Sequence, residues 1–282
     1  MKLLGQESTL TTNVSERMTM LLWGGAGCGK TVLLATLPKP ILWLQYDNEG
    51  VRSLGQRHKD QIQVFDMSKI AAAQVNEFKE GEAAEAQLRG IIREQKPATL
   101  VVDSLTSFGE LCLVHAVQSG KAAAGSKDFK PTIEQPGISG YGVRNGIMLS
   151  VVRMLLRITA EQSVHLAMST HEDSPDRDMK TGNIIRISMM LGGALSEQVP
   201  LKISEIWYMK DEGKRRMIYM RPFGFHQPMR TRMFRTQEAS SFVFNYDLDT
   251  DKGLKVSRMY EVWKERGFDK MPIDVIDQLS KE

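Results

Sequence analysis

The chain has 282 residues, of which 41% are hydrophobic and 25% charged, with 23 glycines and 10 prolines. These values are ordinary for a globular protein and exclude fibrous, collagen-like and wholly disordered chains. A formal net charge of +3 is too small to indicate a nucleic-acid or membrane partner by itself.

The chain contains two cysteines, Cys28 and Cys112, too few for a disulfide scaffold or a four-cysteine zinc site. Reduced thiols are typical of the cytoplasm. Residues 1–20 lack the apolar core of a signal peptide, and no apolar run reaches the roughly 18 residues of a membrane span. We therefore expect a cytoplasmic protein with no membrane partner.

Short apolar runs alternate with longer amphipathic stretches, a pattern typical of an α/β fold with a parallel sheet covered by helices. Helical faces recur within residues 84–92 and 147–158. Residues 201–209 and 216–220 are predicted strands joined by a turn, an antiparallel hairpin that extends the sheet. The predicted parallel strands are residues 18–23, 41–44, 63–65, 100–103 and 164–169.

Two long polar segments interrupt this order, at residues 119–140 and 171–200. Loops of this length inside a compact domain are usually functional or mobile. The expected organisation is an N-terminal segment (1–17), a core (18–235) and a C-terminal extension (236–282) with short helices at 256–267 and 273–281.

The strongest motif is GGAGCGKT at residues 24–31, directly after the first predicted strand. It fits the P-loop pattern, in which backbone amides surround phosphates, the lysine contacts the β- and γ-phosphates and the threonine hydroxyl binds Mg²⁺. We therefore expect ATP and Mg²⁺ as cofactors. The residues expected to contact the nucleotide are Gly24, Gly25, Ala26, Gly27, Cys28, Gly29, Lys30, Thr31 and Val32.

The second motif is an acidic residue, Asp103, at the end of the predicted strand 100–103. Opposite Thr31, this carboxylate would hold Mg²⁺ through water. A strand that ends in Asp before Ser104 is by itself equally compatible with a helix N-cap. The P-loop upstream favours the metal role.

The third element is the segment YDNEG at residues 46–50, which we expect at the tip of the strand beside the P-loop strand. A carboxylate there can orient and deprotonate the water that attacks the γ-phosphate. Glu49 is the predicted general base, and Asp47 is the alternative. A solvated acidic turn would explain the same residues without catalysis.

Together, the P-loop, YDNEG at 46–50 and VDS at 102–104 resemble the RecA family. In that family a glutamate after the second strand is the catalytic base, and an Asp-Ser pair follows the fourth strand; Glu49 and Asp103 match these positions. The chain looks most like the short RecA-like ATPases of bacteriophages associated with recombination and single-strand annealing, over about residues 18–235. The resemblance implies a RecA-like P-loop fold, and the host cytoplasm as location if the protein is phage-encoded.

The resemblance also implies a polar sensor after the fifth strand, where RecA proteins have a glutamine. His171 matches this place and would hydrogen-bond the γ-phosphate. A histidine at a strand end is otherwise an ordinary surface residue.

The two polar segments fall where RecA proteins have DNA-binding loops. Such loops need cations for phosphates and usually aromatic side chains for bases, and their charge here is nearly balanced, so solvated loops that bind no DNA are an alternative. The candidate DNA-binding residues are Lys121, Lys127, Lys130, Arg177, Lys180 and Arg186.

A basic excess follows the hairpin, in residues 210–235. RecA-like assemblies place a basic-x-basic pair here that reaches the ATP of the neighbouring subunit, and Arg230 and Arg232 match it. Such an arginine finger stabilises the transition state in trans. A solvated basic face or a DNA-phosphate contact is the alternative.

The sequence thus favours an ATPase that acts on single-stranded DNA in recombination, repair or annealing, with ATP bound between the subunits of a homo-oligomeric ring or filament. A single-strand-binding or annealing protein is a candidate partner. Alternatives are a ring-forming motor, such as a helicase or packaging ATPase, and a nucleotide-dependent switch that acts on proteins. A small-molecule kinase is disfavoured because neither an acceptor site nor an arginine-rich lid is evident.

Overall fold

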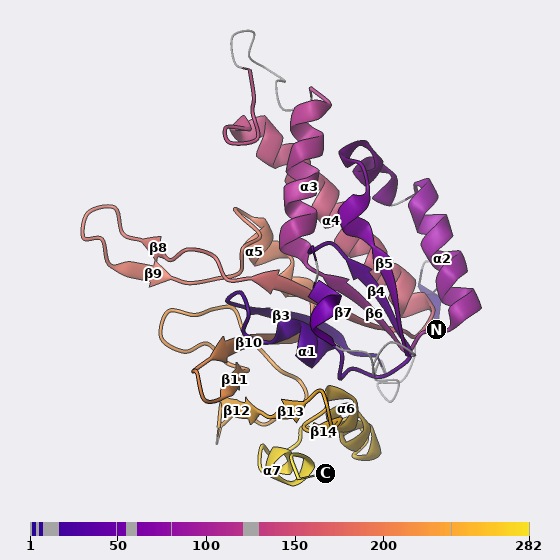
Figure 1. Cartoon of the computed structure of the whole chain (residues 1–282), viewed down its shortest axis with the longest axis vertical. Coiled ribbons are helices and arrows are strands. Elements are labelled where there is room, and N and C mark those ends of the chain that lie inside the picture. The colour runs from indigo at the N-terminus through magenta and orange to yellow at the C-terminus, as the bar shows by residue number, and fades with distance from the viewer. Residues whose placement is uncertain are drawn as a thin grey trace.

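The computed structural model describes residues 2–3, 6–7, 17–48, 50–54, 61–79, 81–120, 130–237 and 239–281. Its centre is an eight-stranded sheet flanked by helices (Figure 1). Along the sheet the strands are β12 (Ser241–Phe244), β11 (Arg216–Tyr219), β10 (Glu205–Asp211), β3 (Thr19–Gly24), β7 (His165–His171), β6 (Thr99–Asp103), β4 (Ile41–Gln45) and β5 (Ile62–Asp66).

Neighbouring strands from β10 to β5 are parallel, whereas β11 and β12 add to the edge in antiparallel orientation. The expected α/β class, with a mostly parallel sheet and a hairpin extension, is confirmed. Each predicted strand of the sheet is present; the strand expected at 201–209 starts only at Glu205, because Pro200–Lys202 forms a 3-10 turn.

One expectation about strand order is wrong. The strand before the YDNEG segment, β4, pairs with β5 and β6, and not with the P-loop strand β3. Strands β7 and β6 lie between them, because β7, the last of the five predicted parallel strands, inserts beside β3. The carboxyl ends of β3, β7, β6 and β4 therefore lie along one edge in that order.

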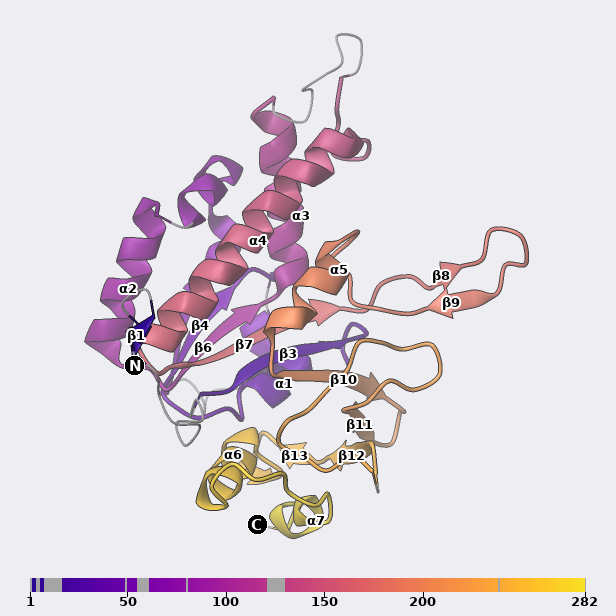
Figure 2. The ribbon, with the colours of Figure 1, turned by 180° about the vertical axis from the view of Figure 1, so that it is seen from behind.

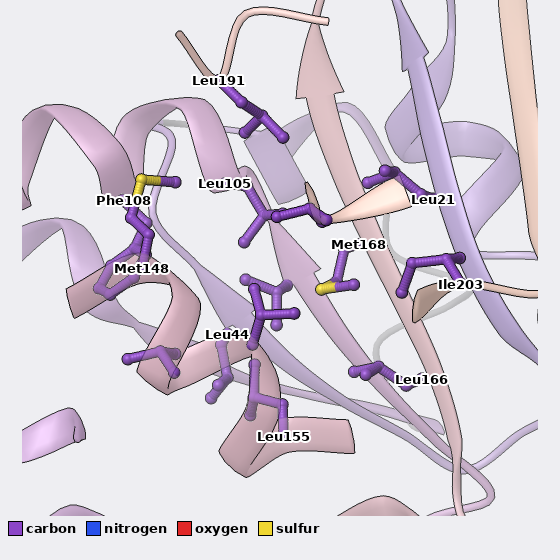
Figure 3. Packing of buried hydrophobic residues seen from close by; sticks show 14 of the residues in the cluster. Leu21, Leu44, Leu105, Phe108, Met148, Leu155, Leu166, Met168, Leu191 and Ile203 are labelled. Atoms are coloured by element: carbon purple, nitrogen blue, oxygen red, sulfur yellow. The ribbon is translucent and has the colours of Figure 1, made fainter. Parts of the chain in front are cut away.

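Helices cover both faces of the sheet (Figures 1 and 2). One face carries α3 and α4, whose side chains pack with strand residues such as Leu44 and Met168 (Figure 3). The other carries α1 and α6, which pack on Leu22 and Trp207. The helices are α1 (Lys30–Leu34), α2 (Ala83–Gln95), α3 (Leu105–Gln118), α4 (Gly137–Glu161), α5 (Leu195–Gln198), α6 (Val256–Glu265) and α7 (Val275–Leu279).

The alternation of side chains along β3 explains this two-sided core. Leu21 and Trp23 face the α3–α4 cluster, whereas Met20 and Leu22 face the α1–α6 cluster, as successive side chains of a strand must. All of them are buried. A strand buried on both faces reads as a continuous apolar run, which is why its position could be predicted.

Smaller elements complete the chain. The segment 171–200, expected as one long loop, contains the hairpin β8 (Asp176–Arg177) and β9 (Ile184–Arg186) and then α5. Residues 137–140, expected in the other polar segment, open α4. Short strand pairs are formed by β1 (Lys2–Leu3) with β2 (Gln6–Glu7) and by β13 (Tyr246–Asp247) with β14 (Lys252–Gly253). Further 3-10 turns are formed by Gly50–Leu54, Met67–Lys69 and Ala72–Phe78.

Among the described residues, no helix combines the length and apolar character that crossing a membrane requires.

Candidate nucleotide-binding site

A tight loop joins the end of β3 to the start of α1 at the carboxyl edge of the sheet. At Gly24 a Cβ atom would lie 2.1 Å from the carbonyl oxygen of Met209, so the strand can end this close to β10 only with glycine. Gly29, immediately before α1, has a φ of 105°, in the region that favours glycine. Backbone amides exposed by such a loop bind phosphate oxygens.

Lys30 is buried in this loop with 7% of its surface exposed. Its Nζ donates hydrogen bonds to the carbonyl oxygens of Gly24 (2.9 Å) and Gly25 (2.8 Å). The ammonium group thus lies inside the curve of the loop, where a phosphate would bind. A buried ammonium needs an anion or several acceptors to offset its desolvation, and the two carbonyl oxygens are such acceptors.

Thr31 and Asp103 meet across the loop. The Thr31 hydroxyl donates to Oδ2 of Asp103 over 3.2 Å, and Ser169 donates to the other carboxylate oxygen. Burial raises the pKa of the Asp103 carboxyl above its ordinary value, and the charge of Asp47 adds to the shift, against the hydrogen bond from Ser169. A divalent cation would reverse this shift, because it stabilises the ionised form.

These two groups fit a magnesium ion. Mg²⁺ is usually held by one or two protein oxygens, several waters and the phosphates of the substrate. Within the described ranges there is no cluster of three or more His, Cys, Asp or Glu side chains that would form a metal cage of protein ligands alone. A hydroxyl and a carboxylate beside a phosphate loop are the donor set expected for Mg²⁺ bound together with a nucleotide.

Asp47 and His171 form a second polar group beside Lys30. His171 ends β7, with Nδ1 3.4 Å from Nζ of Lys30 and Nε2 3.6 Å from Oδ2 of Asp47. The other Asp47 oxygen accepts hydrogen bonds from Ser104 (2.8 Å) and Ser107. Burial opposes ionisation of Asp47, but the neighbouring imidazole and hydroxyls outweigh it and lower the pKa to about 2.

A pocket of about 380 Å³ opens where these groups converge. The predicted base Glu49 lies outside the described residues, so its role stays a prediction, although Asn48 and Gly50 on either side of it line the pocket. Among the other predicted nucleotide contacts, the pocket is lined by Gly27, Gly29, Lys30, Thr31, Val32, Asp103 and His171.

The predicted DNA-binding cations are dispersed. Lys121 and Lys127 lie outside the described residues, and Lys130 is exposed. On the β8–β9 hairpin, Arg186 is paired with Asp176 (3.1 Å) and Glu197 (3.3 Å). Arg177 donates to the carbonyl of Gly182 (2.9 Å), and Lys180 is exposed near the hairpin tip. Of these cations that the structure describes, only Arg186 is neutralised by carboxylates, so it has the least free charge for a phosphate.

Arg230 and Arg232 lie away from the P-loop of their own chain. The backbone of Arg230 pairs with Ile206, near the amino end of β10, and its guanidinium donates to the carbonyls of Pro200 and Ile203. Arg232 is exposed and lines a separate basic pocket together with Arg230. Neither arginine lines the P-loop pocket of its own chain.

Comparison with known proteins identifies the family. Residues 16–243, from the approach to β3 through β12, match the model of the AAA domain family. The chain belongs to the AAA domain family. No protein of curated function matches it.

Two solved structures resemble this AAA domain distantly. A KaiC-like protein from the hyperthermophilic archaeon Pyrococcus horikoshii aligns with a TM-score of 0.45 and 15% identity, covering 82% of this chain and 87% of that protein. The RadB recombinase aligns with a TM-score of 0.43 and 12% identity, covering 81% and 87%. Likenesses this distant say nothing about what the AAA domain described here does.

The AAA domain also brings to the pocket a residue that the sequence analysis did not select. Arg216, at the start of β11, lines the same pocket as Lys30 and Thr31. In the sequence it is one of several cations after the hairpin turn, and no motif distinguishes it. Likewise, nothing in the pattern indicates that Ser104 and Ser107 bind the Asp47 carboxylate.

Proposed function

We propose that this protein hydrolyses ATP with Mg²⁺ between the subunits of a homo-oligomer and acts on single-stranded DNA. The observation that carries the proposal is the Thr31 hydroxyl 3.2 Å from the Asp103 carboxylate, across a P-loop that encloses Lys30. This is the arrangement needed to hold a metal ion and a triphosphate together. Membership of the AAA domain family supports nucleotide binding at this loop.

Different residues of the site would bind the phosphates and the metal ion. Loop amides and Lys30 bind the β- and γ-phosphates, while Thr31, and Asp103 through water, would hold Mg²⁺. When bound, the metal ion would supply positive charge that offsets the negative charge of the phosphates. His171 lies 3.4 Å from the Lys30 ammonium, which supports a contact of its imidazole with the γ-phosphate.

Glu49 is the preferred general base over Asp47. A pKa of about 2 makes Asp47 a weak proton acceptor at neutral pH, because a useful base has a pKa near the operating pH. Both oxygens of Asp47 are also engaged, with two hydroxyls on one side and His171 on the other. We therefore assign Asp47 to the positioning of His171 and Glu49 to the activation of the attacking water.

Arg232 is the preferred arginine finger. Arg230 is tied to two carbonyl oxygens of its own chain, whereas no hydrogen bond or ion pair of the Arg232 guanidinium occurs among the described residues. Its position away from its own P-loop suits a contact to the ATP of a neighbouring subunit. The mostly parallel sheet with β7 inserted between the P-loop and Asp103 strands supports the RecA-like reading of the sequence.

A nucleotide-dependent switch that acts on proteins is the second candidate function. The ion pairs of Arg186 on the β8–β9 hairpin favour it, because they neutralise one of the three cations that the hairpin could offer to nucleic acid. Met179 and Ile185 of the same hairpin are exposed apolar side chains, which would suit a protein partner.

Mixing two inactive variants tests the base and the finger together. We expect Glu49→Gln to bind ATP without hydrolysing it and Arg232→Ala to bind but turn over slowly, because each removes a different half of an interface site. An equal mixture should recover about a quarter of the wild-type rate, from interfaces that combine an intact base with an intact arginine. Wild-type hydrolysis by Glu49→Gln would reject the base, and a mixture without recovery would reject the finger in trans.

A further inference from the structure

Arg216 lies at the P-loop of its own chain, although it belongs to the hairpin extension. A Cβ atom placed on Gly29 would be 3.0 Å from Cδ and 3.1 Å from Nε of Arg216, so the arginine stem lies directly over the loop. The side chain is half-buried and lines the nucleotide pocket. An arginine stem held against glycine in a phosphate loop carries its guanidinium to where phosphates bind.

The Arg216 guanidinium has no hydrogen bond or ion pair within the part of the chain that the structure describes. The acid paired with it in the strand register, Asp211, instead accepts a hydrogen bond from the Gly213 amide at 2.7 Å. The preceding residue, Arg215, differs: its Nε is 3.0 Å from Glu212, and its side chain is 60% exposed. A half-buried guanidinium without a partner is unfavourable unless an anion binds it.

The strand order indicates which phosphate this anion is. Asp103 on β6, the expected metal contact, and His171 on β7, the expected γ-phosphate contact, both lie on one side of β3 and mark the metal end of the site. β10 and β11 lie on the opposite side of β3, so Arg216 approaches the loop from the other direction. A triphosphate that places its γ-phosphate near the metal end directs its α-phosphate, next to the ribose, toward Arg216.

We infer that Arg216 binds the α-phosphate of the nucleotide held by its own subunit, an inference that rests on the proposed nucleotide binding. The planar guanidinium can give two parallel hydrogen bonds to phosphate oxygens, which lysine cannot. Because the α-phosphate does not react, this contact is equally strong before and during hydrolysis. It therefore contributes to binding and not to the chemical step.

The test compares Arg216→Met with Arg215→Met in the full-length chain. Methionine keeps an unbranched stem beside Gly29 and removes the guanidinium. By calorimetry, we expect Arg216→Met to raise the Kd of both MgADP and MgATP by a similar factor, about ten- to a hundred-fold. Arg215→Met should stay within about twofold of the wild type, because its partner is Glu212 at the surface.

Hydrolysis kinetics give an independent readout: Arg216→Met should raise KM and leave kcat nearly unchanged. Arg216→Lys keeps the positive charge but cannot give two parallel hydrogen bonds, so it should bind nucleotide with intermediate affinity. It replaces the methionine variant if the latter fails to fold. Unchanged affinity in these variants would overturn the inference, as would a loss for MgATP alone, which would place the contact at the γ-phosphate. If the wild type binds no nucleotide, the proposed function fails; if it binds and Arg216 has no effect, only this inference fails.

Discussion

At the scale of single residues, Glu205 is a buried carboxyl group with three hydrogen-bond donors around it. It is fully buried at the start of β10, where the side chains of Thr231 and Trp207 and the amide of Arg232 donate to it. Burial is the larger effect and raises its pKa to about 7. The folded protein thus retains a proton that the unfolded chain, with a pKa of 4.5, releases more readily.

This difference makes stability depend on pH in a defined direction. The folded state binds more protons than the unfolded state between pH 4.5 and about 7, so the free energy of unfolding falls as the pH rises through this window, by roughly 3 kcal/mol in total. Glu205→Gln replaces the titratable carboxyl group with a neutral amide and should abolish this part of the pH dependence. Urea unfolding of both proteins at pH 5 and pH 8 measures it, since all other titrations are shared. An identical pH dependence in the two proteins would contradict this explanation.

The residues of the site differ in how far the sequence could reveal them. Lys30, Thr31 and Asp103 stand in motifs or at strand ends, and the structure brings them around one pocket. The hydrogen bond from Ser107 to Asp47 joins residues 60 positions apart, and Arg216 reaches Gly29 from a different part of the sheet. Contacts of this kind depend on how strands are ordered, which a local pattern does not contain.

At the scale of elements, the β8–β9 hairpin projects away from the sheet (Figure 1). Asp178 stabilises its tip by accepting hydrogen bonds from the amides of Lys180 (3.0 Å) and Thr181 (2.7 Å). Lys180 is an exposed cation near this tip, unlike Arg186, which is paired with two carboxylates. If the hairpin contacts single-stranded DNA, we expect Lys180 to meet a phosphate.

The salt dependence of DNA binding tests this contact. Each phosphate contact to a single strand contributes about 0.7 to the slope of log Kd against log salt concentration. We expect Lys180→Ala to weaken binding to oligo(dT) and to lower this slope by about that amount. Lys281→Ala, at the end of the chain, serves as the control and should change neither. A Lys180→Ala variant with wild-type affinity and slope would remove the hairpin from the DNA site and favour the protein switch.

Strands that are buried on both faces could be predicted closely, whereas the two- and three-residue strands β8 and β9 could not. Residues 41–44 and 100–103 were predicted, and the structure has Ile41–Gln45 and Thr99–Asp103. The strands β8 and β9 have two and three residues and are largely exposed, so they show neither an apolar run nor alternation. The position of β4 was wrongly predicted, because the order of strands in a sheet need not follow their order in the chain.

At the scale of the whole molecule, the C-terminal helices are joined to the P-loop side of the sheet. The amides of Val256 and Ser257 donate to the side chain and the carbonyl of Thr36, which follows α1. Met259 and Trp263 of α6 pack in the same cluster as Leu33 of α1. The short P-loop helix is therefore stabilised from outside by the end of the chain, which holds the nucleotide loop in place.

All of the proposed chemistry depends on the loop around Lys30 binding a nucleoside triphosphate, with its metal ion held from Thr31 and Asp103. Titration of the purified full-length chain with MgATP by calorimetry, beside Lys30→Ala, tests it most directly. We expect saturable binding to the wild type and a loss of at least about a hundredfold in affinity in Lys30→Ala, since a charged hydrogen-bond donor at the phosphates is removed. A folded wild type with no affinity for any nucleoside triphosphate in the presence of Mg²⁺ would contradict it.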